Sequence, residues 1–176
     1  LQEALEQRIR QKLMGQVPVT PKTGTFYSSP YDNLDGCNWT YGYQDLMYMY
    51  SVEGYTLTQL SSSSFRVNLA VNAGQFQSTP FANSPTGFFW CPNHTGDAYL
   101  EFLYGSYVVD VSIRFLSNGS LAVSLLNAAS VSFQDPVFEL RQGLMLPVDQ
   151  DLEDAMMNVL ASTQIAQDLN GKLATE

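Results

Sequence analysis

Residues that usually carry acid–base catalysis are scarce in this chain of 176 residues. The one histidine, His94, follows Cys91 by three positions and lies inside a candidate glycosylation sequence. A carbohydrate on the residue before it would crowd the ring, so we expect an exposed loop histidine rather than a general base. Three carboxylates in or near expected strands, Asp97, Glu101 and Asp110, keep a carboxylate-dependent hydrolase as the weaker alternative. The sequence predicts a protein without enzymatic activity.

Metal and nucleotide chemistry also lack the residues that they need. The segment 32–36 (DNLDG) has the composition of a calcium loop, but that register places Gly42 where a bidentate glutamate belongs. We interpret the segment as a turn. The twelve glycines are dispersed and form no phosphate-binding loop. We therefore predict no metal site and no cofactor.

The two cysteines, Cys37 and Cys91, are 54 positions apart, which fits neither a zinc site nor a redox pair. A disulfide is the simplest interpretation, and two buried thiols are the alternative. Three Asn-x-Ser/Thr sequences, at Asn38, Asn93 and Asn118, are candidate glycosylation sites. Together these features favour a secreted glycoprotein, with a bacterial periplasmic protein as the alternative.

Composition and charge exclude several classes of partner. Eight Lys and Arg against 17 Asp and Glu give a formal net charge of −9, which repels nucleic-acid backbones and anionic membranes. Hydrophobic residues make up 45% of the chain, enough for one folded domain over residues 1–176. No apolar run approaches the roughly 20 residues that cross a bilayer, so we expect no transmembrane span. The chain begins at Leu1 without a signal-peptide pattern, and we expect that a leader has been removed.

Helical periodicity occurs at both ends of the chain. In residues 1–14, apolar residues recur at every fourth position, from Leu1 to Leu13. Residues 149–173 carry a wider apolar stripe at spacings of three to four, preceded by acidic residues that favour a helix N-terminus. We predict an amphipathic N-terminal helix and a C-terminal helix of about 20 residues.

The segment between the helices has the pattern of antiparallel strands. Residues 16–50 are predicted to hold a surface loop and tyrosine-rich strands, and residues 55–140 a sheet, with a turn at Glu53-Gly54 between them. Residues 65–72 and 109–115 alternate most clearly between apolar and polar positions. Asn118-Gly119 predicts a tight hairpin. The expected fold class is α+β, an antiparallel meander with the long C-terminal helix packed on it.

Aromatic residues concentrate between residues 26 and 50. Tyrosine combines apolar area with a polar end, so it suits both half-buried strands and contact surfaces. We interpret most of these residues as strand and rim packing, and keep a protein-binding surface as the alternative. On that alternative, the partner would contact Trp39, Tyr41 and Tyr43.

This order of elements resembles one half-module of the tubular lipid-binding (TULIP) superfamily, which includes bactericidal/permeability-increasing proteins, takeout and juvenile-hormone-binding proteins, and small mite allergens. The resemblance runs from about Tyr55 to Lys172, through the alternating strands, Asn118-Gly119, residues 135–138 (DPVF) and the helix from Leu152 to Leu173. It implies a highly curved sheet wrapped around the last helix, with an apolar ligand between them. Either an open pocket or a filled core would be lined by Phe65, Val67, Leu69, Val71, Val111, Ile113, Phe115, Met156, Val159 and Leu160.

The leading hypothesis is therefore a secreted, non-enzymatic protein that binds a lipid or another apolar small molecule between sheet and C-terminal helix. The alternative is a secreted protein-interaction or structural domain with a solid core, which contacts its partner through the tyrosine-rich region 26–50.

Overall fold

The computed structural model describes residues 1–18, 22–32, 37–84, 91–101, 104–134, 137–141, 154 and 165–174. Helix α1 (Gln2–Lys12) opens the chain, and helix α3 (Ile165–Leu173) lies near its end. In the described part, ten strands between them form one antiparallel sheet. The strands are β1 (Gly15–Pro18), β2 (Lys22–Asp32), β3 (Asn38–Gln59), β4 (Ser64–Asn83), β5 (His94–Thr95), β6 (Asp97–Glu101), β7 (Tyr104–Phe115), β8 (Leu121–Leu125), β9 (Ser130–Gln134) and β10 (Val137–Arg141).

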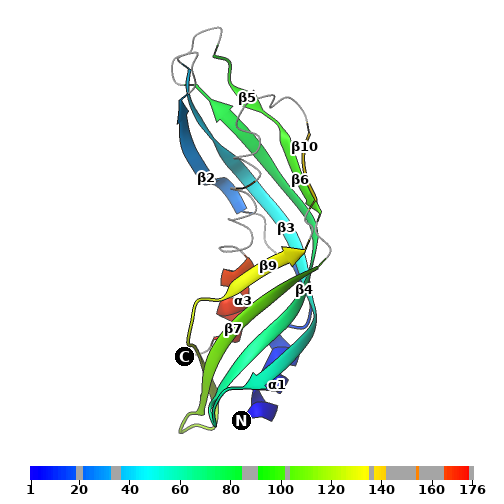
Figure 1. Ribbon diagram of the computed structural model, residues 1–176, viewed down its shortest axis with the longest axis vertical. Coiled ribbons are helices and arrows are strands. Elements are labelled where there is room, and N and C mark those ends of the chain that lie inside the picture. Colours follow the sequence, from blue (N-terminus) through cyan, green and yellow to red (C-terminus); the bar gives the residue numbers. More distant parts are fainter. Residues whose placement is uncertain are drawn as a thin grey trace.

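Strand β4 runs through the middle of this sheet. Strand β3 pairs along one side of it, from Gln59 opposite Phe65 to Thr40 opposite Asn83. Strands β7, β6 and β5 pair in succession along the other side. The outer positions of the sheet are also occupied by several successive strands. β1 and β2 pair with β3, β8 and β9 pair with β7, and β10 pairs with β6. The result is a long, curved sheet, with both helices toward one end (Figure 1).

This architecture confirms the predicted α+β class and two of its local features. The Asn118-Gly119 hairpin forms as expected, with Phe115 opposite Leu121 and Gly119 at a φ of +80°. The side-chain Oδ1 of Asn118 accepts hydrogen bonds from the backbone N–H and the hydroxyl group of Ser120. The alternation in residues 65–72 is also confirmed, because its apolar positions are buried and Arg66, Asn68 and Ala70 are exposed.

The predicted turn at Glu53-Gly54 is wrong. Strand β3 continues through it to Gln59, and its pairing with β4 jumps from Val52 opposite Val71 to Gly54 opposite Ala70. Glu53 is therefore the extra residue of a β-bulge. The bulge lies next to Gly54, and the strand continues beyond it. The surface loop predicted in the first part of residues 16–50 is replaced by β1 and β2, both of which pair with β3.

A second bulge in β3 turns tyrosines on both sides of it toward the core. The pairing with β4 shifts by one residue between Gln44 and Met47, so inward positions change from odd to even numbers. Asp45 lies in this bulge at a φ of +53°, and its Oδ1 accepts a hydrogen bond from the backbone N–H of Gly24. The inward residues are Trp39, Tyr41 and Tyr43 before the bulge, then Leu46, Tyr48, Tyr50 and Val52 after it.

The main core lies between the concave face of the sheet and the two helices. Residues 64–71 of β4 and 105–115 of β7 supply many of the core side chains that come from the sheet. These two segments, together with the two helices, are named the helix-covered end. The helices supply Leu5, Ile9, Leu13, Ile165, Ala166, Leu169 and Leu173, each at most 2% exposed. Helix α3 covers residues 165–173 of the helix predicted over 149–173, and residues 149–164, with the exception of 154, lie outside the described part.

Arg8 ties the two helices together. Its Nε donates to the carbonyl oxygen of Leu173 at 2.9 Å, and its Nη2 donates to those of Lys172 and Ala174 at 2.9 and 3.2 Å. Carbonyl groups at a helix C-terminus have no partner within the helix and carry partial negative charge, so a guanidinium group suits them. Desolvation by burial lowers the pKa of Arg8 from its ordinary value. The first helix of the chain thereby caps the last one.

Candidate functional site

Six of the ten predicted lining residues lie together on the concave face of the helix-covered end. They come from two paired strands, with Phe65 opposite Val111 and Val67 opposite Val109. Each keeps between 0% and 1% of its surface exposed, within one cluster that includes side chains of α1 and α3. The six residues are Phe65, Val67, Leu69, Val71, Val111 and Ile113.

This burial shows that the space around these six residues is filled. A side chain that lines an open cavity keeps surface that a water-sized molecule can touch, whereas a close-packed core leaves almost none. With at most 1% exposure, the six residues form a closed core against the helices. The six residues lie together, as the alternation of apolar and polar residues in the sequence predicted. A ligand could reach them only if this core opened.

The other four predicted lining residues are placed differently. Phe115 was expected on the dry face of β7, but it is 56% exposed. It lies at the far end of the strand, where it borders an open groove with Ala4, near the start of α1, instead of lying under the helix. The prediction that Phe115 is buried is wrong because β7 extends beyond the part of the sheet that the helices cover. Met156, Val159 and Leu160 lie outside the described residues.

Polar contacts that no sequence pattern indicated join the sheet to α3. The hydroxyl group of Tyr48 in β3 donates to Asp168 Oδ2 at 2.6 Å, and the hydroxyl group of Tyr107 in β7 donates to Asn170 Oδ1. Lys172 places its Nζ 3.4 Å from the hydroxyl oxygen of Tyr50 and 5.4 Å from the centre of that ring. Hydroxyl groups from two strands thus bond to the helix above the apolar core.

The environment keeps these tyrosines protonated. Burial is the main cause that raises the pKa of Tyr48, and the hydrogen bond to Asp168 raises it further. Burial also raises the pKa of Tyr50 and of Tyr107 above their ordinary value. Lys172 responds in the opposite direction, since burial disfavours its charged form and lowers its pKa. At neutral pH the three hydroxyl groups are therefore protonated: those of Tyr48 and Tyr107 donate to α3, and that of Tyr50 accepts from Lys172.

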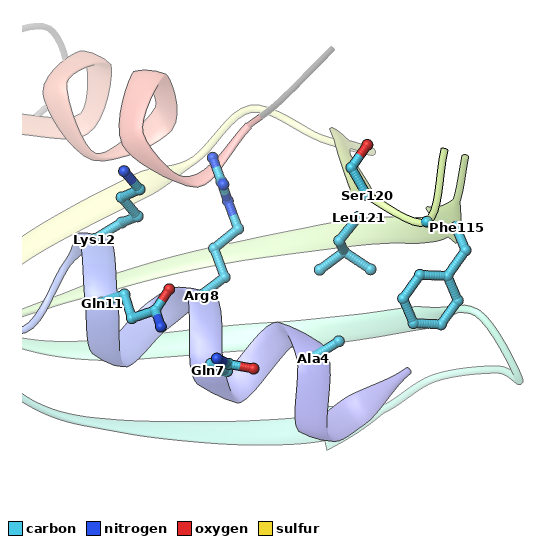
Figure 2. A pocket seen from close by; sticks show the side chains of 9 residues that line it. Ala4, Gln7, Arg8, Gln11, Lys12, Phe115, Ser120 and Leu121 are labelled. Atoms are coloured by element: carbon cyan, nitrogen blue, oxygen red, sulfur yellow. The ribbon is translucent and has the colours of Figure 1, made fainter. Parts of the chain in front are cut away.

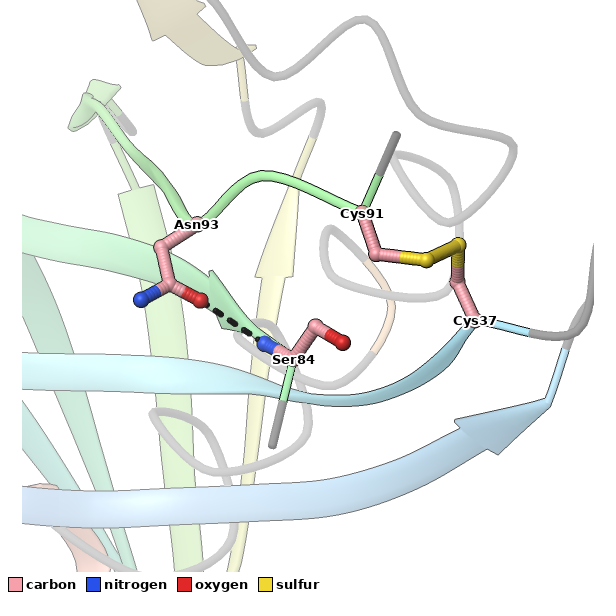
Figure 3. The surroundings of a disulfide bond; sticks show 4 residues. All are labelled: Cys37, Ser84, Cys91 and Asn93. Atoms are coloured by element: carbon pink, nitrogen blue, oxygen red, sulfur yellow. Dashed lines mark hydrogen bonds between the residues drawn. A yellow bond between two sulfur atoms is a disulfide. The ribbon is translucent and has the colours of Figure 1, made fainter. Parts of the chain in front are cut away.

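The opposite end of the sheet is held by the predicted disulfide. Cys37 and Cys91 are bonded, with their Cα atoms 5.6 Å apart, and they form a small buried cluster with Trp39 that is separate from the main core. Close by, Asn93 Oδ1 accepts a hydrogen bond from the backbone N–H of Ser84 at 2.8 Å (Figure 3). Residues 38–44 of β3 and 78–83 of β4, with Ser84 and the two cysteines, are named the disulfide end.

The residues proposed as a protein-binding surface do not form one. Trp39, Tyr41 and Tyr43 are 7%, 8% and 0% exposed, because all three occupy inward positions of β3. The ring of Trp39 meets that of His94 edge-on at 6.3 Å between centroids. Its indole N–H is buried and has no hydrogen-bond partner. The prediction of a contact surface is therefore wrong for these residues, and strand packing accounts for them.

The three candidate glycosylation sites are accessible. Asn38, Asn93 and Asn118 all have exposed side chains. Two lie at the disulfide end, one directly after Cys37 and one two residues after Cys91, and the third is in the β7–β8 hairpin. Asn93 and Asn118 use their Oδ1 atoms for the hydrogen bonds described above, which leaves the amide nitrogen of each as the atom that would carry a carbohydrate.

Asp110, one of the three carboxylates considered for catalysis, lies in an ion pair with Arg66. Asp110 Oδ1 and Oδ2 accept hydrogen bonds from Arg66 Nε and Nη2 at 2.7 and 3.0 Å, and Asn127 also donates to Asp110. The hydrogen bond from Arg66 is the largest cause that lowers the pKa of Asp110, the opposite of what a general acid needs. Within the described ranges, no three His, Cys, Asp or Glu side chains gather as metal ligands. Nor does any helix there have the length and apolar content to span a membrane.

Two grooves flank α1. One, of about 440 Å³, lies between the helix and the β7–β8 hairpin and is drawn in Figure 2. It is lined by Ala4, Gln7, Arg8, Gln11, Lys12, Phe115, Gly119, Ser120 and Leu121. The other, of about 670 Å³, lies between the helix and β3. It is lined by Gln2, Glu6, Arg10, Met14, Gly54, Tyr55, Thr56 and Leu57.

Comparisons with known proteins rest on structure alone. No protein-family model matches the chain, and no curated protein matches its sequence. Among solved structures, lipopolysaccharide binding protein matches with a TM-score of 0.62 over 99% of this chain, at 12% identity. The chain spans 36% of that protein. Takeout 1 of Epiphyas postvittana matches at a TM-score of 0.36 and 16% identity, over 86% of this chain and 67% of its own, a similarity too low to support an argument.

The similarity to lipopolysaccharide binding protein is one of fold. It extends over the whole described architecture of N-terminal helix, curved antiparallel sheet and C-terminal helix. The chain has a fold of the TULIP type, as the order of its sequence elements predicted.

Proposed function

We propose that this protein binds a lipid or another apolar small molecule between the concave face of its sheet and its C-terminal helix. The observation that carries the proposal is the continuous apolar face of β4 and β7, against which α3 packs in a TULIP-type fold. The structural neighbour is named for binding lipopolysaccharide, a lipid. The proposed activity is binding, with no catalytic step and no cofactor.

A ligand would enter this face by taking the place of helix contacts. The six buried residues of β4 and β7 would form its floor, and Met156, Val159 and Leu160 are assigned to the opposite wall from the sequence pattern. Helix α3 is the element whose displacement would expose that floor. Its hydrogen bonds to Tyr48 and Tyr107 are directional, so they favour return to one position, whereas apolar contacts alone would tolerate several.

Displacement of α3 would also break the hydrogen bonds that Tyr48 and Tyr107 donate to it. The hydroxyl group of Tyr107 is a donor at neutral pH, for the reasons given above, and it would need a new acceptor when Asn170 leaves. An ester or carboxyl oxygen of a lipid supplies such an acceptor. We therefore propose an amphipathic lipid over a pure hydrocarbon as the ligand of this face.

Native mass spectrometry of the protein purified from the cells that produce it tests this function. The bound fraction is extracted into organic solvent and identified, and oleic acid and phosphatidylcholine are then added to the stripped protein. A stoichiometric lipid, or uptake of either probe, supports the proposal. A ligand-free mass together with no uptake of either probe contradicts it.

We also propose that the protein is secreted and carries N-linked carbohydrate. The buried disulfide and the three exposed asparagines support an oxidising compartment outside the cytosol. A bacterial periplasm is the alternative. Treatment with an endoglycosidase that converts each occupied asparagine to aspartate, followed by peptide mass mapping, tests Asn38, Asn93 and Asn118 one by one. An unchanged mass contradicts glycosylation and favours the periplasm.

A further inference from the structure

We propose that the groove between α1 and the β7–β8 hairpin binds a single-chain anionic amphiphile, with its anionic group at Lys12 and its apolar chain on Phe115. The chemical class is a medium-chain carboxylate. This site is separate from the face between the sheet and α3, so it neither requires nor excludes the function proposed above.

The lining of the groove changes from charged to apolar along its length. Lys12 lines the groove at one end and Arg8 lies midway, while Ala4, Phe115 and Leu121 line it toward the other end (Figure 2). Lys12 and Ala4 are eight residues apart on α1, which corresponds to about 12 Å along the helix axis. That distance suits a medium-chain fatty acid lying parallel to the helix. Gln7, Gln11 and Ser120 add hydrogen-bonding groups along its walls.

The charge in this groove is of one sign. Its lining residues include two cations and no carboxylate, in a chain whose net charge is −9. Arg8 donates from Nε and Nη2 to carbonyl groups of α3, so Lys12 is the cation assigned to hold the anionic group. Lys12 is exposed. An anion is therefore the complementary ligand.

The groove on the other side of α1 serves as an internal contrast. It holds Glu6 and Arg10, whose charges balance, and Arg10 is already engaged with Tyr55. Arg10 Nε donates to the Tyr55 hydroxyl oxygen at 2.9 Å, and the guanidinium group lies 5.6 Å from the ring centre. The second groove thus offers no unbalanced cation, and it is the matched control.

Phe115 explains why the anion should carry an apolar chain. Its ring is 56% exposed although its strand position points it to the same side as buried Ile113. Exposed aromatic surface is costly to hydrate, and a bound alkyl chain on Phe115, Leu121 and Ala4 would remove it from water. A free amphiphile is favoured over an anionic membrane surface, because the net charge of the chain repels such a surface at longer range.

The test titrates decanoate below its micelle concentration into protein stripped of N-linked carbohydrate, so that Asn118 next to the groove is bare. Calorimetry gives the affinity, and NMR spectra of isotope-labelled protein give the location. We expect resonances of Phe115 and Leu121 to move first. Phe115→Ser should weaken binding about tenfold through lost apolar contact. Lys12→Gln should weaken it about threefold to fivefold, as for an exposed ion pair.

The controls decide between this groove and its competitors. Arg10→Gln, in the charge-balanced groove, should change the affinity by less than about twofold. Circular dichroism checks that each variant is folded. The proposal is overturned if decanoate moves only resonances of the core residues Val67 and Val111, which would still support the proposed function. It is also overturned if decyltrimethylammonium binds equally well, or if phosphatidylglycerol vesicles bind and decanoate does not.

Discussion

The helix-covered end and the disulfide end bury the same face of one sheet by different means. At the helix-covered end, Val67, Leu69 and Val111 meet the two helices with no measurable exposure. At the disulfide end, Trp39 keeps 7% of its surface and packs in a separate small cluster with Cys37 and Cys91, which a covalent bond joins. One end is closed by apolar burial, and the other is tied by a cross-link.

The difference follows from the partners that each end has. A helix presents a continuous apolar stripe, so aliphatic strands can pack against it without leaving polar atoms unpaired. Trp39 at the disulfide end carries a polar atom, and its indole N–H remains without a partner there. An unpaired buried donor reduces stability by about 1–3 kcal/mol. A disulfide can offset such a loss by restricting the unfolded chain.

Removal of the disulfide should have the largest effect on stability. Cys37→Ala with Cys91→Ala frees a loop closed across 54 residues, and the chain-entropy model then gives a loss of about 4 kcal/mol. Urea denaturation of the variant and the parent measures this difference. Because the effect acts on the unfolded state, NMR resonances of Val67 and Val111 should stay in place. Shifts there would mean that the two ends are structurally coupled.

A cavity at the helix-covered end should come next in size. Leu69→Ala removes a fully buried side chain, and we expect a loss of about 3 kcal/mol in the free energy of unfolding. Asn68→Ala on the exposed face of the same strand is the control, with a change within about 0.5 kcal/mol. Equal effects of the two variants would contradict the packing described for this end.

Alkaline pH should weaken the helix-covered end selectively. The folded-state pKa values of Tyr48, Tyr50 and Tyr107 lie above their ordinary value of 10.0, so their neutral forms stabilise the fold fully below pH 10.0. That contribution is lost as the pH rises above this value. Thermal melts across this range should show a steep fall in the melting temperature. Tyr48→Phe should make the fall shallower, and an unchanged slope would argue against the buried hydroxyl groups.

The ion pair on the outer face should contribute least. Arg66 lowers the pKa of Asp110, so the pair stabilises the fold above the ordinary pKa of 3.8 and loses this contribution as the pH falls through the lower folded value. Arg66 is half exposed, and solvent screening keeps the effect small. Asp110→Asn should flatten the acid side of the stability profile slightly. An acid limb that is identical in both proteins would mean that the pair contributes nothing.

Patterns that depend on neighbours in sequence predicted their structure well. Residues 65–72 alternate because a strand exposes its two faces in turn, and Asn118-Gly119 forms the hairpin because glycine adopts a positive φ there. The pairing of Cys37 with Cys91 needed no geometry, since the chain holds only two cysteines. The order of helix, strands and helix was sufficient to indicate a TULIP-type fold.

Features that depend on distant partners were missed. The bulges at Asp45 and Glu53 let β3 stay paired with β4 over a long distance, and the register of that pairing is set by the partner strand. Gly54 is a local signal for the bulge at Glu53. One sequence signal was available for the bulge at Asp45, since the inward aromatic residues change from odd to even positions after Tyr43. The same bulge explains why Trp39 and Tyr41 are buried.

The sequence by itself determined which residues are apolar, the order of helix, strands and helix, the most regular strand in residues 65–72 and the Asn118-Gly119 hairpin, because these follow from composition, periodicity and backbone preference. Only the tertiary structure decided that Phe115 lies beyond the cover of α1, that Tyr48 and Tyr107 bond to α3, and that Arg8 caps that helix. Each of these contacts joins residues far apart in the chain. Their existence depends on how far an element extends and what covers it, which local sequence does not encode.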